Sequence, residues 1–354
     1  MAKYKRKYRI FEKIWAKLQQ YFIYSESVSM LFQHFIRQAD EYGGKRQPFF
    51  FLIDFEQQKP LICPLEQAAE QGVYFAIQGR HNIDWQTDLP VEPFYLDKSP
   101  MTLAQYQAGF ELVQEELQKG NSYLLNLTYA TEIQTNYDLK QLFQYSQAAY
   151  KLYVQDQFVC FSPECFVRIE RDKIYTYPMK GTIDAALDNA EALLLGSPKE
   201  EREHYTIVDL MRNDLATVAQ HIEVSRFRYV EKIQTARGAI LQTSSEIYGH
   251  LAADWQAQIG SILAKLLPAG SISGAPKEKT VRIIRQAEGQ VRGYYSGVFG
   301  VFDGDGLQSA VAIRFIERRA DKLYFRSGGG ITRHSRLQEE YDELLQKVYV
   351  PLKT

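Results

Sequence analysis

Apolar residues recur along this chain at two spacings, and each spacing predicts a different kind of element. Across residues 102–119 they fall three or four positions apart, which predicts an amphipathic helix that ends at Gly120. Residues 1–47 show the same helical spacing. The run Phe49–Ile53 is wholly apolar and short, as expected of a buried strand, and residues 122–131 also have strand character. The N-terminal third therefore mixes helices with strands.

From residue 158 onwards, strand signals alternate with helical segments. Residues 158–177 alternate apolar and polar positions on both sides of residues 171–172, which predicts a hairpin. Residues 308–317 and 323–326 are predicted to be strands, and the glycines at 328–330 are predicted to form a turn at the end of the second one. Helices are expected over residues 185–217, 262–267, 277–288 and 338–348.

Runs of strands interrupted by long helices favour an α+β fold over a doubly wound parallel sheet. The chain has 354 residues, which is enough for two domains or for one large unit. No repeat, low-complexity tract or Pro/Ser linker divides it. We expect residues 1–100 to be a short N-terminal segment that packs on a core formed by residues 101–354, and we expect that core to be one continuous structural domain.

Composition narrows the classes of ligand and the compartment. With 42 basic and 43 acidic residues, the formal charge is −1, so no broad field attracts nucleic acid or a membrane surface. A small charged metabolite or a protein partner is the better expectation. The three cysteines lack zinc-site spacing, which fits a reducing compartment. No apolar run reaches the roughly 18–20 residues that a membrane span needs, and the basic N-terminus has no apolar signal region. We predict a cytoplasmic protein.

Lys180 is the first candidate for chemistry. It stands in Pro-Met-Lys-Gly (residues 178–181), directly after a β-patterned run, so the backbone direction is restricted on both sides of it. Catalytic groups are often mounted on such rigid supports. A lysine that follows a strand can equally be a solvated surface group, and the local pattern alone leaves both interpretations open.

Two glycine-rich segments and one arginine suggest anion binding. Residues 267–277 form a Gly/Ser loop that leads into a helix, where free N–H groups and the helix dipole favour an anion, and Ser273 could cap that helix. The glycines at 328–330 let backbone approach a ligand closely. Arg314 interrupts an apolar strand and could bind a carboxylate. The alternatives are a plain helix-entry turn, a tight turn at a strand end and a solvated arginine.

Three glutamates are candidate ligands of a hard cation. Glu340 and Glu343 lie three positions apart on a predicted helix and therefore share a face, and Glu203 lies far upstream in another helix. Mg²⁺ is usually held by a few carboxylates together with water and substrate oxygens. Acidic helix faces are also commonly just solvated, so the spacing alone does not decide.

Eight segments, taken in order, resemble motifs of the chorismate-utilising enzymes, a family that includes anthranilate synthase component I, aminodeoxychorismate synthase component I, isochorismate synthase and salicylate synthase. The resemblance covers the chain from about residue 102 to the C-terminus. The segments are 162–165 (Ser-Pro-Glu-Cys), 178–182 (Pro-Met-Lys-Gly-Thr), 203–215, 268–277, 295–297 (Tyr-Ser-Gly), 312–314 (Ala-Ile-Arg), 328–331 (Gly-Gly-Gly-Ile) and 340–343 (Glu-Tyr-Asp-Glu), with Lys347.

The resemblance implies two stacked antiparallel sheets flanked by helices, with the active site in the cleft between them. It also implies that Glu203, Glu340 and Glu343 hold Mg²⁺, which would bind one carboxylate of chorismate and help the C4 hydroxyl leave. The resemblance assigns the remaining substrate contacts to Ser273, Gly274, Ala275, Tyr295, Arg314, Gly328, Gly329, Gly330 and Lys347.

Within the family, Lys180 separates two chemistries. The matching position is typically alanine in anthranilate synthases and lysine in aminodeoxychorismate synthases. The implied mechanism is covalent: the lysine amine attacks C2 as the C4 hydroxyl departs, ammonia adds at C4, and a second displacement expels the lysine. The amine must be neutral when it attacks, which burial beside other cations favours. Glu164, in the Ser-Pro-Glu motif, is the expected proton shuttle.

Two positions depart from the family pattern. Members that add water at C2 carry a lysine base where this chain has Leu124, so isochorismate synthase and salicylate synthase chemistry are not expected. The amidating members usually have glutamine there, so leucine is a change even for them. A histidine that assists aromatisation in anthranilate synthases is replaced by Gln242. Its absence favours a product that keeps its enolpyruvyl group.

These residues predict an aminodeoxychorismate synthase component I, on the route to 4-aminobenzoate and folate. The chain shows no glutaminase pattern of Cys and His, so ammonia is expected from a separate glutamine amidotransferase subunit, in a heterodimer. Two alternatives stay open. One is anthranilate synthase component I, which would release pyruvate. The other is a non-catalytic homologue that binds chorismate or a partner, for which Leu124 and Gln242 are the support.

Overall fold

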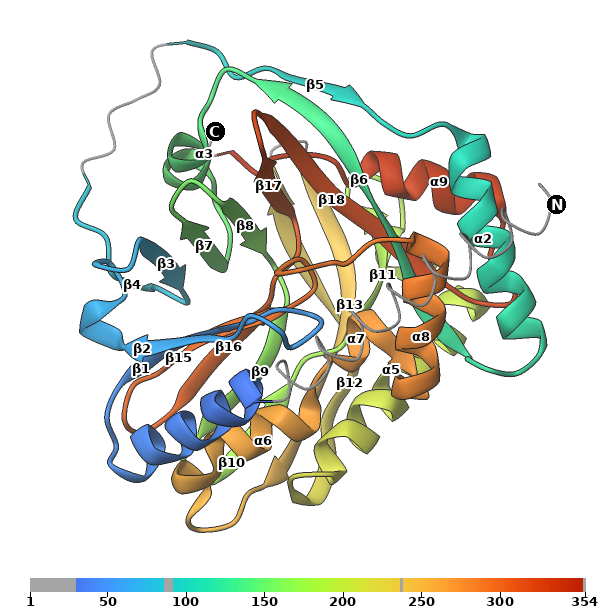
Figure 1. The fold of residues 1–354 in the computed structure, drawn as a ribbon. Coiled ribbons are helices and arrows are strands. Elements are labelled where there is room, and N and C mark those ends of the chain that lie inside the picture. The colour runs from blue at the N-terminus through green and yellow to red at the C-terminus, as the bar shows by residue number, and fades with distance from the viewer. Residues whose placement is uncertain (1–29, 86–91, 236–237, 353–354) are drawn as a thin grey trace, which may run out of the picture.

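The computed structural model describes residues 30–85, 92–235 and 238–352. In this part of the chain, two nine-stranded sheets with antiparallel pairing pack against each other, and helices lie on their outer faces (Figure 1). This confirms the predicted α+β class with two stacked antiparallel sheets. Residues 30–44 are helical, as expected. The rest of the helix predicted near the N-terminus lies outside the described residues.

The first sheet has the strand order β11-β13-β10-β9-β16-β15-β1-β2, with β12 paired to β13. Its long β12–β13 ribbon extends the edge that carries β11. The strands are β1 (Phe49–Ile53), β2 (Leu61–Pro64), β9 (Cys165–Glu170), β10 (Lys173–Thr176), β11 (Met179–Asp184), β12 (Gln220–Thr235), β13 (Gly238–His250), β15 (Val298–Phe302) and β16 (Leu307–Val311).

The second sheet has the order β14-β6-β18-β17-β8-β7-β3-β4, with β5 paired to β6. Its two longest strands, β6 and β18, run side by side. The strands are β3 (Val73–Ile77), β4 (Arg80–His81), β5 (Leu96–Ser99), β6 (Leu124–Thr135), β7 (Tyr150–Val154), β8 (Phe158–Ser162), β14 (Gly274–Ala275), β17 (Phe315–Arg319) and β18 (Lys322–Ile331).

Helices cover the outer faces of both sheets. The helix at 30–44, α5 and α6 pack on the first sheet, whereas α2, α3, α8 and α9 pack on the second. The helices are α2 (Leu103–Gln118), α3 (Leu139–Tyr145), α4 (Ala190–Leu195), α5 (Pro198–Ala216), α6 (Ile259–Leu266), α7 (Gly270–Ser273), α8 (Lys277–Glu288) and α9 (Leu337–Gln346).

The chain passes directly from one sheet to the other at two places. β8 belongs to the second sheet and β9 to the first, and β16 belongs to the first and β17 to the second. The single strand predicted over residues 308–317 is therefore wrong: it breaks at residues 312–314, because Arg314 has a left-handed backbone (φ 53°) that ends the β conformation. The hairpin predicted around residues 171–172 is confirmed as β9–β10.

Two further predictions need correction. The glycines at 328–330 do not form a turn; they lie inside β18, paired with residues 126–128 of β6. Ser273 does not cap α8, whose N-cap residue is Pro276 without a side-chain hydrogen bond; the Ser273 hydroxyl donates instead to the carbonyl of Ala269. Pairing with the distant strand β6 decides the first case, and the short helix α7 that ends at Ser273 decides the second.

The alternating sides of single strands build separate cores. In β1, Phe49 and Phe51 face the helices on the outside of the first sheet, whereas Phe50 and Leu52 face the second sheet. A buried strand with both sides apolar is expected at such a place. Residues 30–100 thus supply β1 and β2 to one sheet and β3, β4 and β5 to the other, and the division at residue 100 stays a prediction.

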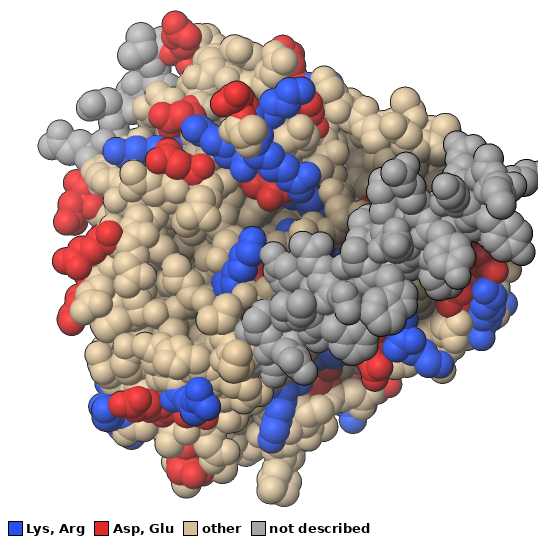
Figure 2. All heavy atoms as spheres, in the orientation of Figure 1, with Lys and Arg blue, Asp and Glu red and all other residues tan. Residues whose placement is uncertain are grey.

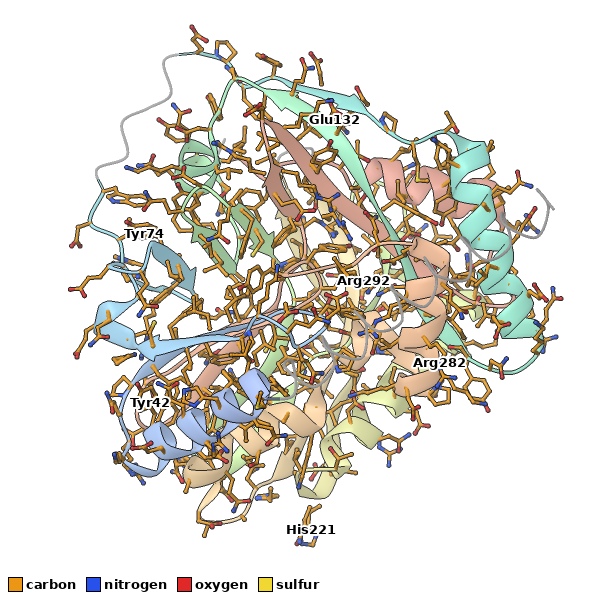
Figure 3. The ribbon with its side chains drawn as sticks, viewed as in Figure 1. Tyr42, Tyr74, Glu132, His221, Arg282 and Arg292 are labelled. Carbon is orange, nitrogen blue, oxygen red and sulfur yellow. The ribbon has the colours of Figure 1, made fainter. Side chains whose placement is uncertain are left out.

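A buried ion pair ties α8 to β6. Glu288 and Arg292 are almost fully buried and 2.6 Å apart, Glu288 accepts from the backbone and hydroxyl of Thr128, and Arg292 donates to the carbonyl of Asn126. Figure 3 shows Arg292 in the interior of the molecule. Breaking a pair of this kind typically costs about 3–5 kcal/mol, so it fixes the strand that carries Asn126 and Thr128.

Surface charges are mixed in sign. Figure 2 shows Lys and Arg side chains interspersed with Asp and Glu on the visible face. Within the part of the chain that the structure describes, no helix is long and apolar enough to cross a membrane.

Candidate active site

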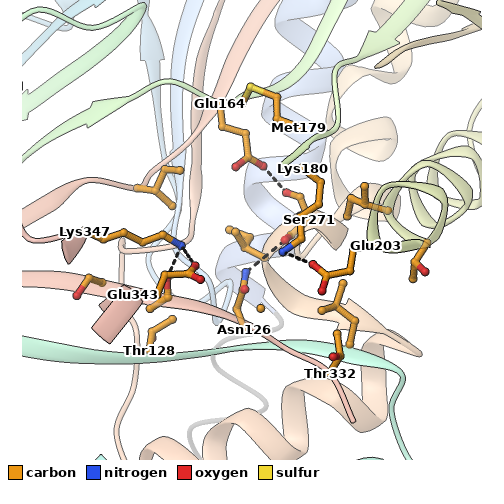
Figure 4. Close-up of a pocket in the computed structure, with 18 of the residues that line it drawn as sticks. Asn126, Thr128, Glu164, Met179, Lys180, Glu203, Ser271, Thr332, Glu343 and Lys347 are labelled. Carbon is orange, nitrogen blue, oxygen red and sulfur yellow. Dashed lines mark hydrogen bonds and ion pairs between the residues drawn. The ribbon is translucent and has the colours of Figure 1, made fainter. Parts of the chain in front are cut away.

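A cavity of about 1050 Å³ is lined by residues of both sheets and of α5 and α9 (Figure 4). Its volume lies just above the range of about 300–1,000 Å³ that is usual for small-molecule sites. The predicted site residues that line it are Glu164, Lys180, Glu203, Tyr295, Arg314, Gly328, Gly330, Glu343 and Lys347. The structure therefore brings together side chains that are up to 183 positions apart in sequence, counted from Glu164 to Lys347.

The two sheet crossings deliver Glu164 and Arg314 to this cavity. The crossings run side by side: the amide of Val311 donates to the carbonyl of Glu164, and the amide of Phe161 donates to the carbonyl of Arg314, each at 3.1 Å. A carboxylate and a guanidinium are thus held at the junction of the sheets by backbone hydrogen bonds. Such mounting on rigid elements is what a positioned acid and a carboxylate anchor need.

Lys180 sits at an irregularity of β11. The register between β11 and β13 shifts between Met179 and Thr182, and Gly181 has φ 95°, a conformation that favours glycine. The carbonyl of Lys180 accepts a hydrogen bond from the hydroxyl of Thr243 and lies 3.4 Å from Nδ1 of buried His204. These two contacts hold the backbone of the bulge in place. The side chain of Lys180 points into the cavity (Figure 4).

The amine of Lys180 is held as a cation. Its Nζ lies 2.9 Å from Oε2 of Glu203. Burial acts to lower the pKa of Lys180, but the charges of Glu203 and Glu343 and the hydrogen bond to Glu203 outweigh it, and the pKa is raised above its ordinary value. An attack by this amine requires that it first lose a proton.

The surroundings of Glu164 favour its neutral form, whereas those of Lys180 favour its charged form. Burial raises the pKa of its carboxyl group above the usual range, although the Ser271 hydroxyl, which donates to Oε1, and the charges of Arg314 and Lys347 act against this. A raised pKa makes the carboxyl group hold its proton to higher pH than an exposed glutamate does, as a proton donor requires. Glu164 is thus suited by its surroundings to the proton transfer that the sequence predicts.

Lys347 lies one residue beyond α9 and also points into the cavity. Its Nζ donates to the carbonyl of Gly328 at 2.9 Å and pairs with Oε1 of Glu343 at 2.6 Å. Burial lowers the pKa of Lys347, and repulsion by Arg314 and Lys180 adds to this despite the charge of Glu343. Together with Arg314, this amine gives one part of the cavity the positive charge that a carboxylate requires.

Glu340 and Glu343 lie against the backbone of β18. A side chain at Gly329 would bring its Cβ within 2.9 Å of Oε1 of Glu343 and 3.3 Å of Oε2 of Glu340, so both carboxylates occupy space that glycine leaves open. Burial, and then the charge of Glu343, raises the pKa of Glu340. Two carboxylates that repel each other fit a divalent cation, since Mg²⁺ often uses one or two carboxylates together with substrate oxygens and water.

Glu203 stands apart from these two carboxylates, beside Lys180. Among the described residues, no three His, Cys, Asp or Glu side chains are gathered closely enough to form a metal-binding group. Glu340 and Glu343 are carboxylates of the kind that Mg²⁺ binds, whereas Oε2 of Glu203 is engaged by Nζ of Lys180.

Ser273, Gly274 and Ala275 do not line the cavity. Gly274 and Ala275 form β14 and pair with Leu125 and Leu124 of β6. Gly274 has φ 101°, and a Cβ there would lie 1.8 Å from the carbonyl oxygen of Leu124. Its glycine is thus explained by close strand packing. Gly329 and Glu340 are also absent from the cavity wall, although both contact the region around Glu343.

Sequence reasoning missed several residues that do line the cavity. Ser271 lies in the same Gly/Ser loop as Ser273 but faces Glu164, and Asn126 donates to the Ser271 carbonyl at 3.2 Å. The loop itself was the available signal; which serine faces inward depends on the short helix α7. The remaining missed polar residues on the wall include Tyr123, Thr128, Lys199, Arg202, Thr206, Thr332, Arg333, His334, Arg336 and Glu339.

Leu124 and Gln242, the two departures from the family pattern, both line the cavity. Leu124 offers no group that can take a proton from water. The amide of Gln242 donates to the hydroxyl of Thr182 at 3.4 Å, next to the bulge that carries Lys180. Both departures from the family pattern therefore alter the chemistry of one cavity wall.

Comparison with known proteins agrees with this geometry. A family model described as chorismate binding enzyme matches residues 30–353. A PabA-like protein of Pasteurella multocida, itself uncharacterised, is 70% identical over 90% of this chain and 98% of its own length. Aminodeoxychorismate synthase component 1 of Escherichia coli is 32% identical over 73% of this chain, which spans only 60% of that protein.

Solved structures share the fold. The menaquinone-specific isochorismate synthase of Escherichia coli superposes with a TM-score of 0.66, covering 89% of this chain and 80% of that one, at 17% sequence identity. At 17% sequence identity, the similarity shows a shared fold and carries no conclusion about activity.

Proposed function

The chain belongs to the chorismate binding enzyme family, and on that premise we propose that it is an aminodeoxychorismate synthase component I, which converts chorismate and ammonia to 4-amino-4-deoxychorismate. The observation that carries the proposal is a lysine amine, Lys180, that shares one cavity with a half-buried carboxyl group, Glu164. A two-step substitution requires a nucleophile and a proton donor that can both reach the same substrate. The name of the relative from Escherichia coli supports the same activity.

In the proposed reaction, Lys180 forms a bond to C2 of chorismate while the electrons of the ring double bond shift and the C4–O bond breaks. Glu164 gives its proton to the departing oxygen, which leaves as water. Ammonia then forms the C4–N bond, the double bond shifts back, and the C2–N bond electrons return to Lys180. In each displacement one bond to carbon forms as another breaks, so no oxidant or reductant is needed.

We propose that the substrate is bound by positively charged side chains of the cavity wall and by exposed backbone of β18. Arg314 and Lys347 are suited to one carboxylate of chorismate, and Tyr295 and the backbone of Gly328 and Gly330 border the same space. We propose that Glu340 and Glu343, joined by Glu203, hold Mg²⁺, which when bound would neutralise a substrate carboxylate and assist departure of the C4 hydroxyl. Recruitment of Glu203 away from Lys180 would also remove the charge that keeps the amine protonated.

The ammonia is proposed to come from a glutamine amidotransferase subunit in a heterodimer, and the product to serve 4-aminobenzoate and folate synthesis in the cytoplasm. Leu124 supports amination over hydration, because a leucine cannot activate water for attack at C2. Gln242 supports retention of the enolpyruvyl group, since an amide is a poor general acid or base.

The test is to incubate the chain with chorismate, ammonium and Mg²⁺ and to identify the product by mass. We expect 4-amino-4-deoxychorismate without pyruvate. Anthranilate together with pyruvate would assign the chain to anthranilate synthase chemistry, and chorismate binding without turnover would assign it to a non-catalytic role. Omission of Mg²⁺, checked with a chelator, is expected to stop turnover.

A further inference from the structure

Arg326 of β18 carries a charge in the interior of the molecule. Its side chain is 0% exposed, and none of its three guanidinium nitrogens has a hydrogen-bond partner within the described residues. Nη1 lies 3.5 Å from Oε1 of Glu317, which is an ion pair without a hydrogen bond. Buried polar groups normally have hydrogen-bond partners, and a buried charge without them is costly. Packing alone therefore gives no reason for an arginine at this position.

The carboxylates near Arg326 do not neutralise it fully. Burial lowers the pKa of Arg326, although the charges of Glu317 and Glu288 act against this. Each of these carboxylates lies closer to another arginine: Glu317 is 2.6 Å from Arg319, and Glu288 is 2.6 Å from Arg292. Three guanidinium groups thus share two carboxylates, which leaves an excess of positive charge in the interior.

Tyr295 connects this charge to the large cavity. The guanidinium carbon of Arg326 lies 5.2 Å from the centre of the Tyr295 ring, and Tyr295 lines the cavity, whose wall Arg326 does not join. Phe315, which pairs with Arg326 across β17 and β18, packs edge-on against the same ring, with 6.0 Å between ring centres. No hydrogen bond joins the Tyr295 hydroxyl to another described residue, so this hydroxyl is available to a ligand in the cavity.

A cation over a tyrosine ring affects the hydroxyl group as well as the ring. It is attracted to the electron-rich face, and it draws electron density away from the O–H bond, which becomes a stronger hydrogen-bond donor. Burial raises the pKa of Tyr295, and the charges of Arg292, Arg326 and Arg314 act against this rise. The same three cations favour an anion that accepts a hydrogen bond from Tyr295.

We propose that Arg326 is a positioning residue for substrate binding. It holds the ring of Tyr295 in place from behind and strengthens the hydrogen bond that the Tyr295 hydroxyl donates to a carboxylate of chorismate. The inference rests on the proposed binding of chorismate in this cavity, and it adds a source of charge that does not touch the substrate. A stability cost that is retained for binding accounts for a poorly compensated charge in the core.

Arg326→Met tests this role, because it removes the charge and keeps much of the apolar stem. Glu317 keeps its partner Arg319 at 2.6 Å, so the substitution leaves no carboxylate unpaired. Replacing a buried ion by an apolar side chain of similar size is often neutral or stabilising, and we expect Tm to rise by about 1–4 °C.

Binding should change in the opposite sense. The Kd for chorismate, measured by calorimetry with Mg²⁺ and without ammonium, is expected to rise about fivefold or more in Arg326→Met. In the amination assay the KM for chorismate should rise with it, while kcat changes less than about twofold, because the contact is made in the ground state and the transition state alike.

Three further variants separate charge from shape. Arg326→Lys keeps a cation behind the ring and should recover part of the affinity without the gain in Tm. Arg319→Met removes the exposed arginine that pairs with the same glutamate, and its Kd should stay within about twofold of wild type. In a Tyr295→Phe background, Arg326→Met should change Kd less than about twofold, because the hydroxyl through which the charge acts is absent.

Other outcomes overturn the inference. A lower Tm or loss of the folded state in Arg326→Met means that the arginine supports the fold. A higher Tm with unchanged Kd means that the buried charge has no part in binding, and a full effect in the Tyr295→Phe background means that it does not act through the hydroxyl. Chorismate binding without amination by the wild type contradicts the proposed function, whereas the binding comparison still decides the role of Arg326, so the two failures are distinguishable.

Discussion

Lys180 and Lys347 enter one cavity from different elements, and each pairs with a glutamate, yet their surroundings act on them in opposite directions. Lys180 lies 2.9 Å from Glu203, and its pKa is raised. Lys347 lies 2.6 Å from Glu343, and its pKa is lowered. Burial acts to lower the pKa of both amines. The direct partner therefore does not decide the outcome.

The charges beyond the direct partner decide the direction in which each lysine pKa shifts. Lys180 is surrounded by carboxylates, since Glu343 and Glu200 add to the effect of Glu203. Lys347 has one carboxylate and faces the cations of Arg314 and Lys180. In this structure the proposed nucleophile is thus the more strongly protonated of the two lysines. The roles of the two lysines can be separated by experiment, because a nucleophile and a charge anchor fail in different ways.

The largest effect is expected from Lys180→Ala. Without the amine there is no covalent step, and formation of aminated product, measured by mass at saturating substrates, should fall by about a thousandfold or more. Lys180→Arg is the matched control, because it keeps the charge beside Glu203 but cannot deprotonate. Both variants should be inactive. Activity above a tenth of wild type in either variant would sink the covalent role.

A smaller effect is expected from Lys347→Met. The substitution removes a charge suited to a substrate carboxylate but keeps much of the apolar stem, so kcat/KM should fall about 10–100-fold, chiefly through a higher KM for chorismate. Lys347→Arg should recover part of the loss. If kcat instead collapses as far as in Lys180→Ala while KM stays constant, Lys347 takes part in the chemical step.

The titration of the two amines can be measured directly. After reductive methylation with ¹³C-labelled formaldehyde, each lysine gives an NMR signal whose shift follows its protonation, and Lys180→Arg and Lys347→Arg assign the two signals. We expect the Lys347 signal to titrate at lower pH than the Lys180 signal, because cations surround the first and carboxylates the second. The reverse order would show that the ion pair with Glu343 dominates at Lys347.

Local pattern predicted some elements of this fold with their bounds, but it gave no prediction for the long strands β12 and β13. The strand Phe49–Ile53 and the helix Lys277–Glu288 have the predicted bounds, since a short apolar run and a 3.6-residue period are local properties. The strand over residues 308–317 failed at Arg314, because the break exists to carry the chain between sheets. Nothing within ten residues indicates which sheet a strand joins.

The site shows the same limit. The identity of Glu164, Lys180 and Lys347 was available from sequence motifs, and the structure brings them to one cavity. That Ser271 rather than Ser273 faces the carboxylate was not available, because one turn of α7 sets it. The opposite environments of the two lysines were also beyond sequence, since they arise from side chains that meet only in the fold.

The smallest expected effect concerns Glu164 and stability. Because burial raises its pKa, the folded chain binds this proton more tightly than the unfolded chain, and stability is lost as pH rises through the folded pKa. Glu164→Gln removes the buried charge and should raise Tm at pH 8 by about 1–4 °C. At a pH below the ordinary glutamate value the difference should vanish, because the carboxyl is then protonated in both states.

Glu278→Gln is the control for this measurement, since Glu278 is exposed and its ion-pair partner among the described residues is Arg282 at the surface. The Tm of this variant should follow wild type at both pH values. A lower Tm of Glu164→Gln at pH 8 would show that Arg314 and Lys347 outweigh burial and keep the carboxylate ionised. A higher Tm together with lost turnover would show that the chain retains a destabilising carboxyl group for its chemistry, as Lys180 and Lys347 are retained at the same cavity.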